Sequence, residues 1–132
     1  FVKERSRAGV YEAMRAGRMY ATRSFTGDKI VIDDFSVYDL HTGNNAFIGE
    51  TLTRAQPPVA IHIRLRALTT LNKPETIFLY RNSELIKIFY LNTVLDEWFV
   101  DESPMSNPMC YYRIYGGDSW PTIASNPIFV SK

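Results

Sequence analysis

The sequence predicts a mainly β domain, an antiparallel β-sandwich preceded by one N-terminal α-helix. Its 132 residues include eight Phe, eight Tyr and two Trp. This is more aromatic residues than a small helical bundle usually carries, and strands accept them readily. Helical periodicity is confined to the first 17 residues. About seven short apolar or alternating segments follow, separated by turn residues, and such a series favours a sandwich.

The helix is expected over residues 4–17. Apolar or small residues recur there at the spacing of one helical face, at Val10, Ala13, Met14 and Gly17. Ser6 is a suitable N-cap because its hydroxyl can accept from a free backbone N–H, and Gly17 is a suitable end point. The charged residues of the segment fall elsewhere on the helix.

The first strands follow directly. Residues 19–22 and 29–40 are rich in β-branched and aromatic residues, and the second strand is expected to bend at Asp33-Asp34. Residues 41–50 are rich in turn formers and are expected to form a loop. The clearest strand is 59–68, where apolar and polar residues alternate strictly from Ile61 to Arg66. That alternation predicts one buried face and one solvated face.

The second half of the chain continues this pattern. Residues 77–80 and 85–90 are predicted to form a hairpin around Asn82-Ser83. Residues 93–108, with their cluster of Asp and Glu, are expected to form a looser connection. Residues 109–116 form the next strand, and residues 124–132 supply the last one. The resulting sandwich is expected to be Ig-like or jelly-roll-like.

Charge and hydropathy exclude several classes of partner. Fifteen basic and fourteen acidic residues give a net charge of +1, which argues against nucleic-acid binding through phosphate contacts. No run of about 18 apolar residues occurs, so no membrane span is expected. The single cysteine and the lack of a recognisable signal peptide slightly favour the cytoplasm. Residues 1–23 carry six bases and two acids, which fits either a solvated basic helix or a contact surface for another domain.

Few residues in this sequence could take part in catalysis or metal binding. Two histidines, His41 and His62, share no spacing typical of a metal site, and His62 is expected to be a surface residue between arginines. Cys110 is expected to be a small buried apolar residue. No nucleophile elbow, P-loop or dinucleotide-binding motif is present. We therefore assign no catalytic residue and no metal ligand, and expect no cofactor in this chain.

One strand has a composition suited to binding. In residues 109–116, alternation places Tyr111, Arg113 and Tyr115 on one face. Together with Trp120, this row could stack on a sugar ring or on a partner protein. The same row could instead pack beneath a neighbouring strand or loop.

Several segments together resemble one known family. Residues 12–24 (EAMRAGRMYATRS) are similar to the segment that follows the catalytic barrel in PHP (polymerase and histidinol phosphatase) metal-dependent phosphoesterases. Four later segments resemble that family in order and spacing: FIGETL (47–52), VAIHIRLRAL (59–68), IFLYRNSELI (77–86) and CYYRIYGGDSWPTIASNPIFV (110–130). The resemblance covers nearly the whole chain.

The resemblance implies a C-terminal β-sandwich attached to an upstream barrel. Residues 1–23 would then be the helix and linker leading from the barrel, and residues 24–132 the sandwich. Zinc, manganese or iron would bind in the barrel, because the family's H-x-H and D-x-H ligand motifs have no counterpart in this chain. Arg15, Arg18 and Tyr20 become the candidate junction residues. The expected partner is the upstream catalytic barrel of the same chain, with a homo-oligomer as a further option.

Two functions are therefore expected. The leading one is a non-catalytic accessory domain that supports a PHP-like barrel, its substrate access or its oligomerisation. The alternative is an independent carbohydrate- or protein-binding module that uses Tyr111, Arg113, Tyr115 and Trp120. Neither function requires this chain to act as an enzyme by itself.

Overall fold

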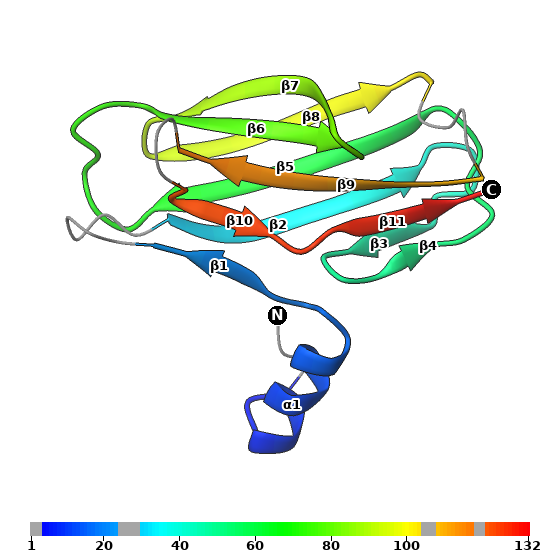
Figure 1. Cartoon of the computed structure of the whole chain (residues 1–132), viewed down its shortest axis with the longest axis horizontal. Coiled ribbons are helices and arrows are strands. Elements are labelled where there is room, and N and C mark those ends of the chain that lie inside the picture. Colours follow the sequence, from blue (N-terminus) through cyan, green and yellow to red (C-terminus); the bar gives the residue numbers. More distant parts are fainter. Residues whose placement is uncertain (1–3, 24–29, 104–107, 118–120) are drawn as a thin grey trace.

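The computed structural model describes residues 4–23, 30–103, 108–117 and 121–132. These residues form one helix, α1 (Arg7–Arg15), and eleven strands. The strands make two sheets that face each other across one core, with α1 projecting below them (Figure 1). The predicted β-sandwich with one preceding helix is confirmed.

The smaller sheet has four antiparallel strands. Their spatial order is β3 (Asn45–Phe47), β2 (Ile30–Asp39), β5 (Val59–Ala67) and β8 (Val94–Asp101). The register of β2 against β5 shifts between Ile32 and Asp34, so the predicted bend is a β-bulge. This bulge turns two consecutive carboxylates, Asp33 and Asp34, toward side chains on the same outer face of β5.

The larger sheet has seven strands and is centred on β9 (Met109–Gly116). On one side of β9 lie β6 (Glu75–Arg81) and then β7 (Glu84–Leu91). On its other side lie two short pairs, β10 (Ile123–Ser125) with β1 (Tyr20–Thr22), and β11 (Ile128–Ser131) with β4 (Thr51–Leu52). The β11–β4 pair is parallel, and the other described pairs are antiparallel.

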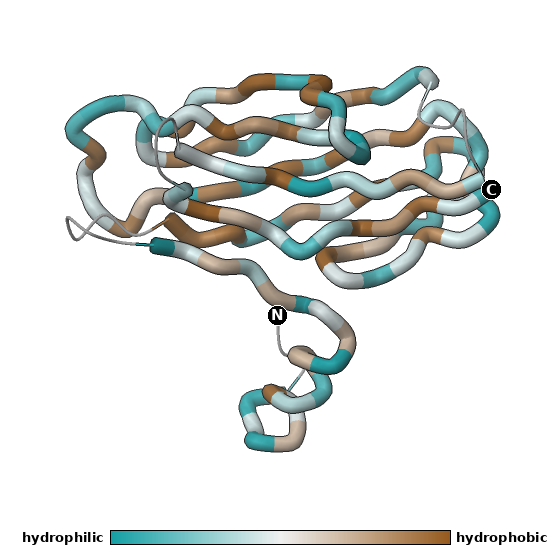
Figure 2. Tube along the Cα trace, viewed as in Figure 1, coloured by the Kyte–Doolittle hydropathy of each residue, from teal (hydrophilic) through white to brown (hydrophobic). Residues whose placement is uncertain are grey.

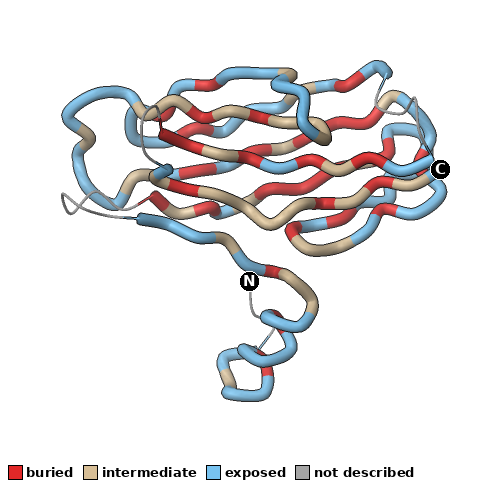
Figure 3. Tube along the Cα trace, in the orientation of Figure 1, coloured by how far each residue is buried: buried red, intermediate tan, exposed pale blue. Residues whose placement is uncertain are grey.

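The core lies between the sheets and comes from alternate residues of each strand. Apolar residues and buried residues recur along the strands, with exposed positions between them (Figures 2 and 3). The largest fully buried side chains include Phe35, Ile61, Ile63, Leu65, Ile77, Leu79, Tyr112 and Ile114. The strict alternation predicted for residues 59–68 is confirmed, because Ile61, Ile63 and Leu65 are fully buried.

The predicted hairpin is also confirmed. Its two strands, β6 and β7, are joined at Asn82-Ser83 with Arg81 paired to Glu84. Asn82 adopts the left-handed conformation (φ 54°), which asparagine tolerates better than most residues. Its backbone N–H donates to the Tyr111 carbonyl oxygen at 2.8 Å, and its side-chain oxygen accepts from the Tyr111 N–H at 3.1 Å. The turn is therefore fastened to β9.

Two predicted loops contain strands. Residues 94–101 form β8 and not a loose connection, because Leu95 and Phe99 pack toward the core while the strand hydrogen-bonds along β5. Glu97 also lies on that inner side. The alternation of apolar and polar residues is therefore broken in the sequence, although the strand itself is regular. Within the predicted loop 41–50, β3 forms because Ala46 is buried beside β2.

The chain ends also differ from expectation. Helix α1 is shorter than residues 4–17, although Ser6 caps it as predicted by accepting from the Gly9 N–H at 3.1 Å. The last segment splits at Asn126-Pro127 into β10 and β11, which pair with different parts of β9. Strand β1 lies inside the predicted linker 1–23 but belongs to the larger sheet. In the described part of the chain, no helix has the length and apolar character needed to cross a membrane.

Candidate functional site

Helix α1 is fastened to the sandwich at its C-terminal end. The Asn126 side-chain amide donates to the Gly17 carbonyl oxygen at 2.9 Å, and the Asn126 backbone N–H donates to the Met19 carbonyl oxygen at 3.2 Å. Next to this contact, the Gly49 N–H donates to the Pro127 carbonyl oxygen at 3.0 Å. We call the contact of Gly17 with Gly49 and Asn126 the junction.

The junction requires glycine at two positions. Gly17 and Gly49 both have positive φ, 68° and 82°, a region that other L-residues rarely adopt. A Cβ atom on Gly49 would lie 2.3 Å from the Gly17 carbonyl carbon, much closer than non-bonded atoms approach. The two backbones therefore pass in direct contact, and this contact fixes the direction in which α1 leaves the sandwich.

The candidate junction residues from the sequence occupy different environments. Arg18 is only 7% exposed and pairs with Glu12 at 2.9 Å. Tyr20 is half-buried and packs against the core. Arg15 is exposed in the last turn of α1. Substitution of Arg18 or Tyr20 would therefore disturb folding, and of these three side chains only Arg15 presents an exposed surface to a partner.

The expected apolar face of α1 is not buried by the sandwich. Of the residues in α1, all of which the structure describes, only Gly9 and Ala13 are buried. Val10, Tyr11 and Met14 are 47%, 50% and 53% exposed, because the helix projects away from the sheets (Figures 1 and 3). We call these three residues the α1 patch.

The Tyr–Arg–Tyr row lies on the outer face of the larger sheet. Its members, Tyr111, Arg113 and Tyr115, alternate along β9 with buried residues, as predicted. The Arg113 guanidinium carbon is 5.5 Å from the centre of the Tyr80 ring, and Tyr111 meets Phe129 edge-on at 6.1 Å. The row is thus part of a wider aromatic surface. Trp120, the fourth predicted member, lies outside the described residues.

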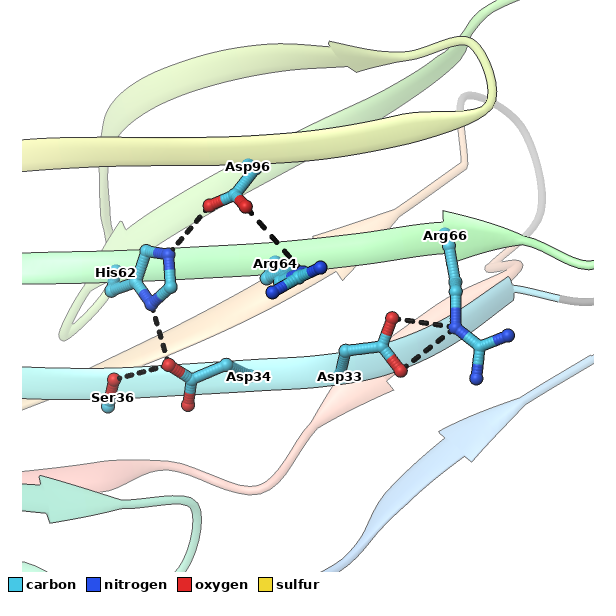
Figure 4. Close-up of polar contacts among 7 residues, drawn as sticks. All are labelled: Asp33, Asp34, Ser36, His62, Arg64, Arg66 and Asp96. Carbon is cyan, nitrogen blue, oxygen red and sulfur yellow. Dashed lines mark hydrogen bonds and ion pairs between the residues drawn. The ribbon is translucent and has the colours of Figure 1, made fainter.

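A polar network crosses the outer face of the smaller sheet (Figure 4). His62 Nδ1 is 2.6 Å from an Asp34 oxygen, and His62 Nε2 is 2.8 Å from an Asp96 oxygen. Ser36 donates to the same Asp34 oxygen at 3.0 Å. The hydrogen bond from His62 holds the pKa of Asp96 below its ordinary value, and the nearby Arg64 acts in the same direction.

His62 lies on the polar outer face of β5 as expected, but its side chain is only 14% exposed and lies between two carboxylates, Asp34 and Asp96. The reason is geometric, because directly opposed residues on neighbouring strands are closer, at about 4.5–5.5 Å, than residues two apart along one strand, at about 6.6 Å. The environment of His62 is therefore set by β2 and β8, which are distant in sequence.

This network does not form a metal site. Asp34 and Asp96 contact opposite nitrogens of the same imidazole ring, so their oxygens do not converge on one point. Among the described residues, no group of three or more His, Cys, Asp or Glu side chains is arranged to hold a metal ion. The network instead ties three strands together across the sheet.

A second cluster closes one end of the sandwich. Arg81 donates to both oxygens of buried Asp101 at 3.0 Å, and the Tyr112 hydroxyl donates to Asp101 at 2.8 Å. Burial raises the pKa of Tyr112, and its hydrogen bond to Asp101 acts in the same direction, so the hydroxyl remains a donor. Cys110 is buried as predicted, and burial raises the pKa of its thiol. These contacts have a structural role.

The other histidine belongs to a turn. Asp39 is buried and accepts from the backbone N–H groups of His41, Thr42 and Gln56 at 2.8–3.2 Å. Burial opposes ionisation of Asp39, yet these donors outweigh it and lower its pKa below the ordinary value. His41 Nε2 lies 2.9 Å from the Pro57 carbonyl oxygen. Both residues therefore organise the turn.

The fold and the junction define a β-sandwich that carries a projecting, firmly attached helix. No model of a known protein family matches the chain. The search of curated proteins likewise finds no match.

Two features of the site were missed by sequence reasoning. Gly49 lies in the segment predicted to be a loop and Asn126 in the segment predicted to be the last strand, and neither residue carries a signal that marks it as a contact of the helix. The His62 network depends on Asp34 and Asp96, which were interpreted as a bend residue and a loop residue. The adjacent pair Asp33-Asp34 within a β-branched segment was the available signal, since a bulge can place both on one face.

Proposed function

We propose that this chain is a non-catalytic accessory domain that docks onto a neighbouring catalytic domain through α1. The observation that carries the proposal is the α1 patch, which is exposed on a helix whose direction is fixed by the junction. We further propose that the neighbour is a PHP-like metal-dependent phosphoesterase barrel in the same chain.

A short helix with an exposed apolar side needs a partner. Isolated helices under about 12 residues are marginal in water, because nucleation is costly and few hydrogen bonds follow. Helix α1 has nine residues, of which only Gly9 and Ala13 are buried, and Gly9 lies against Glu4 of the segment before the helix. Burial of the α1 patch against another domain would supply the missing packing.

The PHP part of the proposal draws support from the convergence of three resemblance segments. Gly17 lies in the first segment, Gly49 in FIGETL and Asn126 in the last one. They are far apart in the sequence and were selected for order and spacing only, yet they meet at the junction. In this proposal, the contact between the three segments would orient the helix toward the barrel.

In this proposal the barrel supplies the chemistry. A metal cluster there would lower the pKa of a bound water for phosphoester hydrolysis. The sandwich would orient the barrel, and its exposed basic residues on α1, such as Arg7 and Arg15, would face an acidic or neutral surface. The alternative use of the Tyr–Arg–Tyr row in carbohydrate or protein binding remains a prediction.

The identity of the neighbour is tested by the reading frame upstream of Phe1. We expect it to encode clustered His and Asp residues, including an H-x-H motif, and the purified full-length protein to contain stoichiometric zinc, manganese or iron. A frame without such clusters would refute the PHP assignment and leave the docking proposal standing.

Docking is tested with the double variant Val10→Glu/Met14→Glu. In the full-length protein we expect loss of activity and a lower melting temperature of the catalytic domain, whereas the 132-residue chain should melt as the parent does. Ala8→Glu is the matched control, since Ala8 is also exposed but lies two residues, about 200° of helix, from Val10. Unchanged activity and melting in the double variant would show that α1 is not the docking element.

A further inference from the structure

Strand β8 is attached to the smaller sheet by side chains as well as by its backbone. In the described structure, β8 pairs only with β5 and is therefore an edge strand. On the outer face, His62 of β5 contacts both neighbouring strands. Its Nδ1 lies 2.6 Å from an Asp34 oxygen on β2, and its Nε2 lies 2.8 Å from an Asp96 oxygen on β8 (Figure 4). We call these two contacts of His62 the clasp.

Both contacts of the clasp need a hydrogen on the ring nitrogen. An ionised carboxylate only accepts hydrogen bonds, and a neutral imidazole has one N–H and one lone pair, whereas the imidazolium has two N–H groups. The hydrogen bond from His62 lowers the pKa of Asp96 below its ordinary value, so Asp96 accepts as a carboxylate. The complete clasp therefore contains the charged form of His62.

The other charged groups on this outer face do not replace that proton. Arg64, also on β5, has its Nε 3.5 Å from the second Asp96 oxygen. Asp33 on β2 accepts from Arg66 Nε at 2.7 and 3.0 Å, so those two charges are already paired. In the clasp, the imidazolium and Arg64 balance two carboxylates. A neutral imidazole would leave two carboxylates with one cation.

Loss of the ring proton should release β8 and keep β2. A neutral ring retains one N–H, and its other nitrogen then presents a lone pair to a carboxylate. The side chain of Asp34 is 24% exposed and that of Asp96 is 48% exposed, so water can replace the imidazole more easily at Asp96. The remaining hydrogen should therefore stay on Nδ1, on the shorter contact to Asp34, and the contact with Asp96 would be lost.

We infer that His62 is a proton-dependent clasp on β8, closed while the imidazole is charged and open once it is neutral. By proton linkage, the clasp stabilises the attachment of β8 while the ring holds its proton, and this contribution is lost as the pH rises through deprotonation of the ring. In acid, the contribution extends below pH 3.8, because the pKa of Asp96 is lowered from that value. The inference does not depend on docking through α1.

Trp98 on β8 reports the charge of the ring. Its indole stacks on the His62 ring with 4.4 Å between centres and 15° between planes, and it also meets the Tyr38 ring at 5.2 Å. A cation next to an indole face interacts with its π electrons, so loss of the charge should change the emission of Trp98.

The fluorescence test uses the 132-residue chain with Trp120→Phe, which leaves Trp98 as the single tryptophan. Emission is followed from about pH 5 to about pH 8.5, below the usual tyrosine titration near pH 10. We expect a one-proton transition that is absent in His62→Gln. The matched control is His41→Gln, which removes the other histidine of the chain and should keep the transition.

Release of β8 is measured by amide hydrogen exchange at pH 6 and pH 8.5, corrected for intrinsic exchange rates. Relative to the amides of β9, the opening equilibrium of the β8 amides should rise by about threefold to tenfold at the higher pH. Asp96→Asn should abolish this rise, because an amide can accept from an N–H or donate to a lone pair and so keeps the link in both states. Asp33→Asn, on the same face, should keep the rise.

Three results would overturn the inference. The first is a β8 exchange that does not respond to pH in the parent chain. The second is a response of the same size in Asp96→Asn, a variant at a half-exposed position that serves as the test even if His62→Gln folds poorly. The third is a Trp98 transition without any change in β8 exchange, which would mean that His62 titrates without holding the strand.

Discussion

At the residue scale, the junction depends on the space beside Gly49. We expect Gly49→Ala to lower the free energy of unfolding by about 3 kcal/mol, combining left-handed strain of about 1 kcal/mol with a backbone clash. Gly43→Ala is the matched control, since Gly43 also has positive φ, 73°, but nothing lies within 4 Å of its Cβ position. It should cost only about 1 kcal/mol. Urea denaturation measures the free energy of unfolding of both variants. Equal losses in Gly49→Ala and Gly43→Ala would contradict the close-contact explanation.

Asp39 should make stability depend on pH in the acid range. Its folded pKa lies below its ordinary value of 3.8, so its contribution is complete above that value and is lost as the pH falls through the folded pKa. Asp39→Asn places an amide N–H₂ against backbone donors and should cost about 1–3 kcal/mol at pH 7. Denaturation at pH 7 and pH 2.5 should show the difference shrinking in acid. A difference that is constant with pH would refute this role.

Single-residue environments were the least predictable part of the chain. Cys110 could be placed correctly because a small apolar residue within an apolar strand has few alternatives. His62 could not, because its partners Asp34 and Asp96 come from strands 28 and 34 positions away. Alternation shows which face a residue occupies, but it does not show which strands lie on either side.

At the scale of elements, the unpaired edges of β7 and β8 each carry one inward-pointing charged residue, Lys87 and Glu97, which opposes pairing with another strand. We expect the double variant Lys87→Val/Glu97→Val to associate, because it removes both inward charges from hydrophobic edge strands. The exchange Lys87→Glu/Glu97→Lys keeps one charge on each edge and should remain monomeric. Size-exclusion chromatography with light scattering distinguishes these results. A monomeric valine variant would show that the charges are unnecessary for this purpose.

Element prediction succeeded where the local pattern is complete. The strand at 59–68, the hairpin turn at Asn82-Ser83 and the bend at Asp33-Asp34 each have a signal within a few residues. Strand β8 was missed because Glu97 points inward at an open edge, where it stays solvated and breaks the expected alternation. An edge strand can tolerate such a residue, whereas a central strand would not.

At the scale of the whole molecule, the sandwich should fold without α1. A chain that starts at Gly17 loses the burial of Gly9 and Ala13 and the pair of Glu12 with Arg18. We expect a cooperative unfolding transition, with the free energy of unfolding lowered by no more than about 2 kcal/mol. Thermal unfolding followed by circular dichroism measures it. Removal of residues 126–132, which deletes β11, should abolish the transition, and a cooperative transition there would contradict the assignment of β11 to the core.

The architecture was predictable as a whole because aromatic content, turn spacing and one helical segment all favour the same fold. The sheet order was not, since β9 is flanked by two short pairs and β4 joins β11 in parallel. Those pairings depend on how the chain breaks at Asn126-Pro127. Nothing within a few residues of that dipeptide specifies which part of β9 each side will meet.

The break between β10 and β11 at Asn126-Pro127 has a consequence for how the sequence of this domain can evolve. Helix α1 is held through the main-chain carbonyl oxygens of Gly17 and Met19, which accept hydrogen bonds from the side-chain and backbone amides of Asn126. Main-chain atoms are the same whatever side chains the helix carries. The exposed residues of α1 can therefore be replaced to suit a different neighbour while the angle of the helix is kept. The sandwich can hold the helix in the same orientation whichever side chains the helix presents.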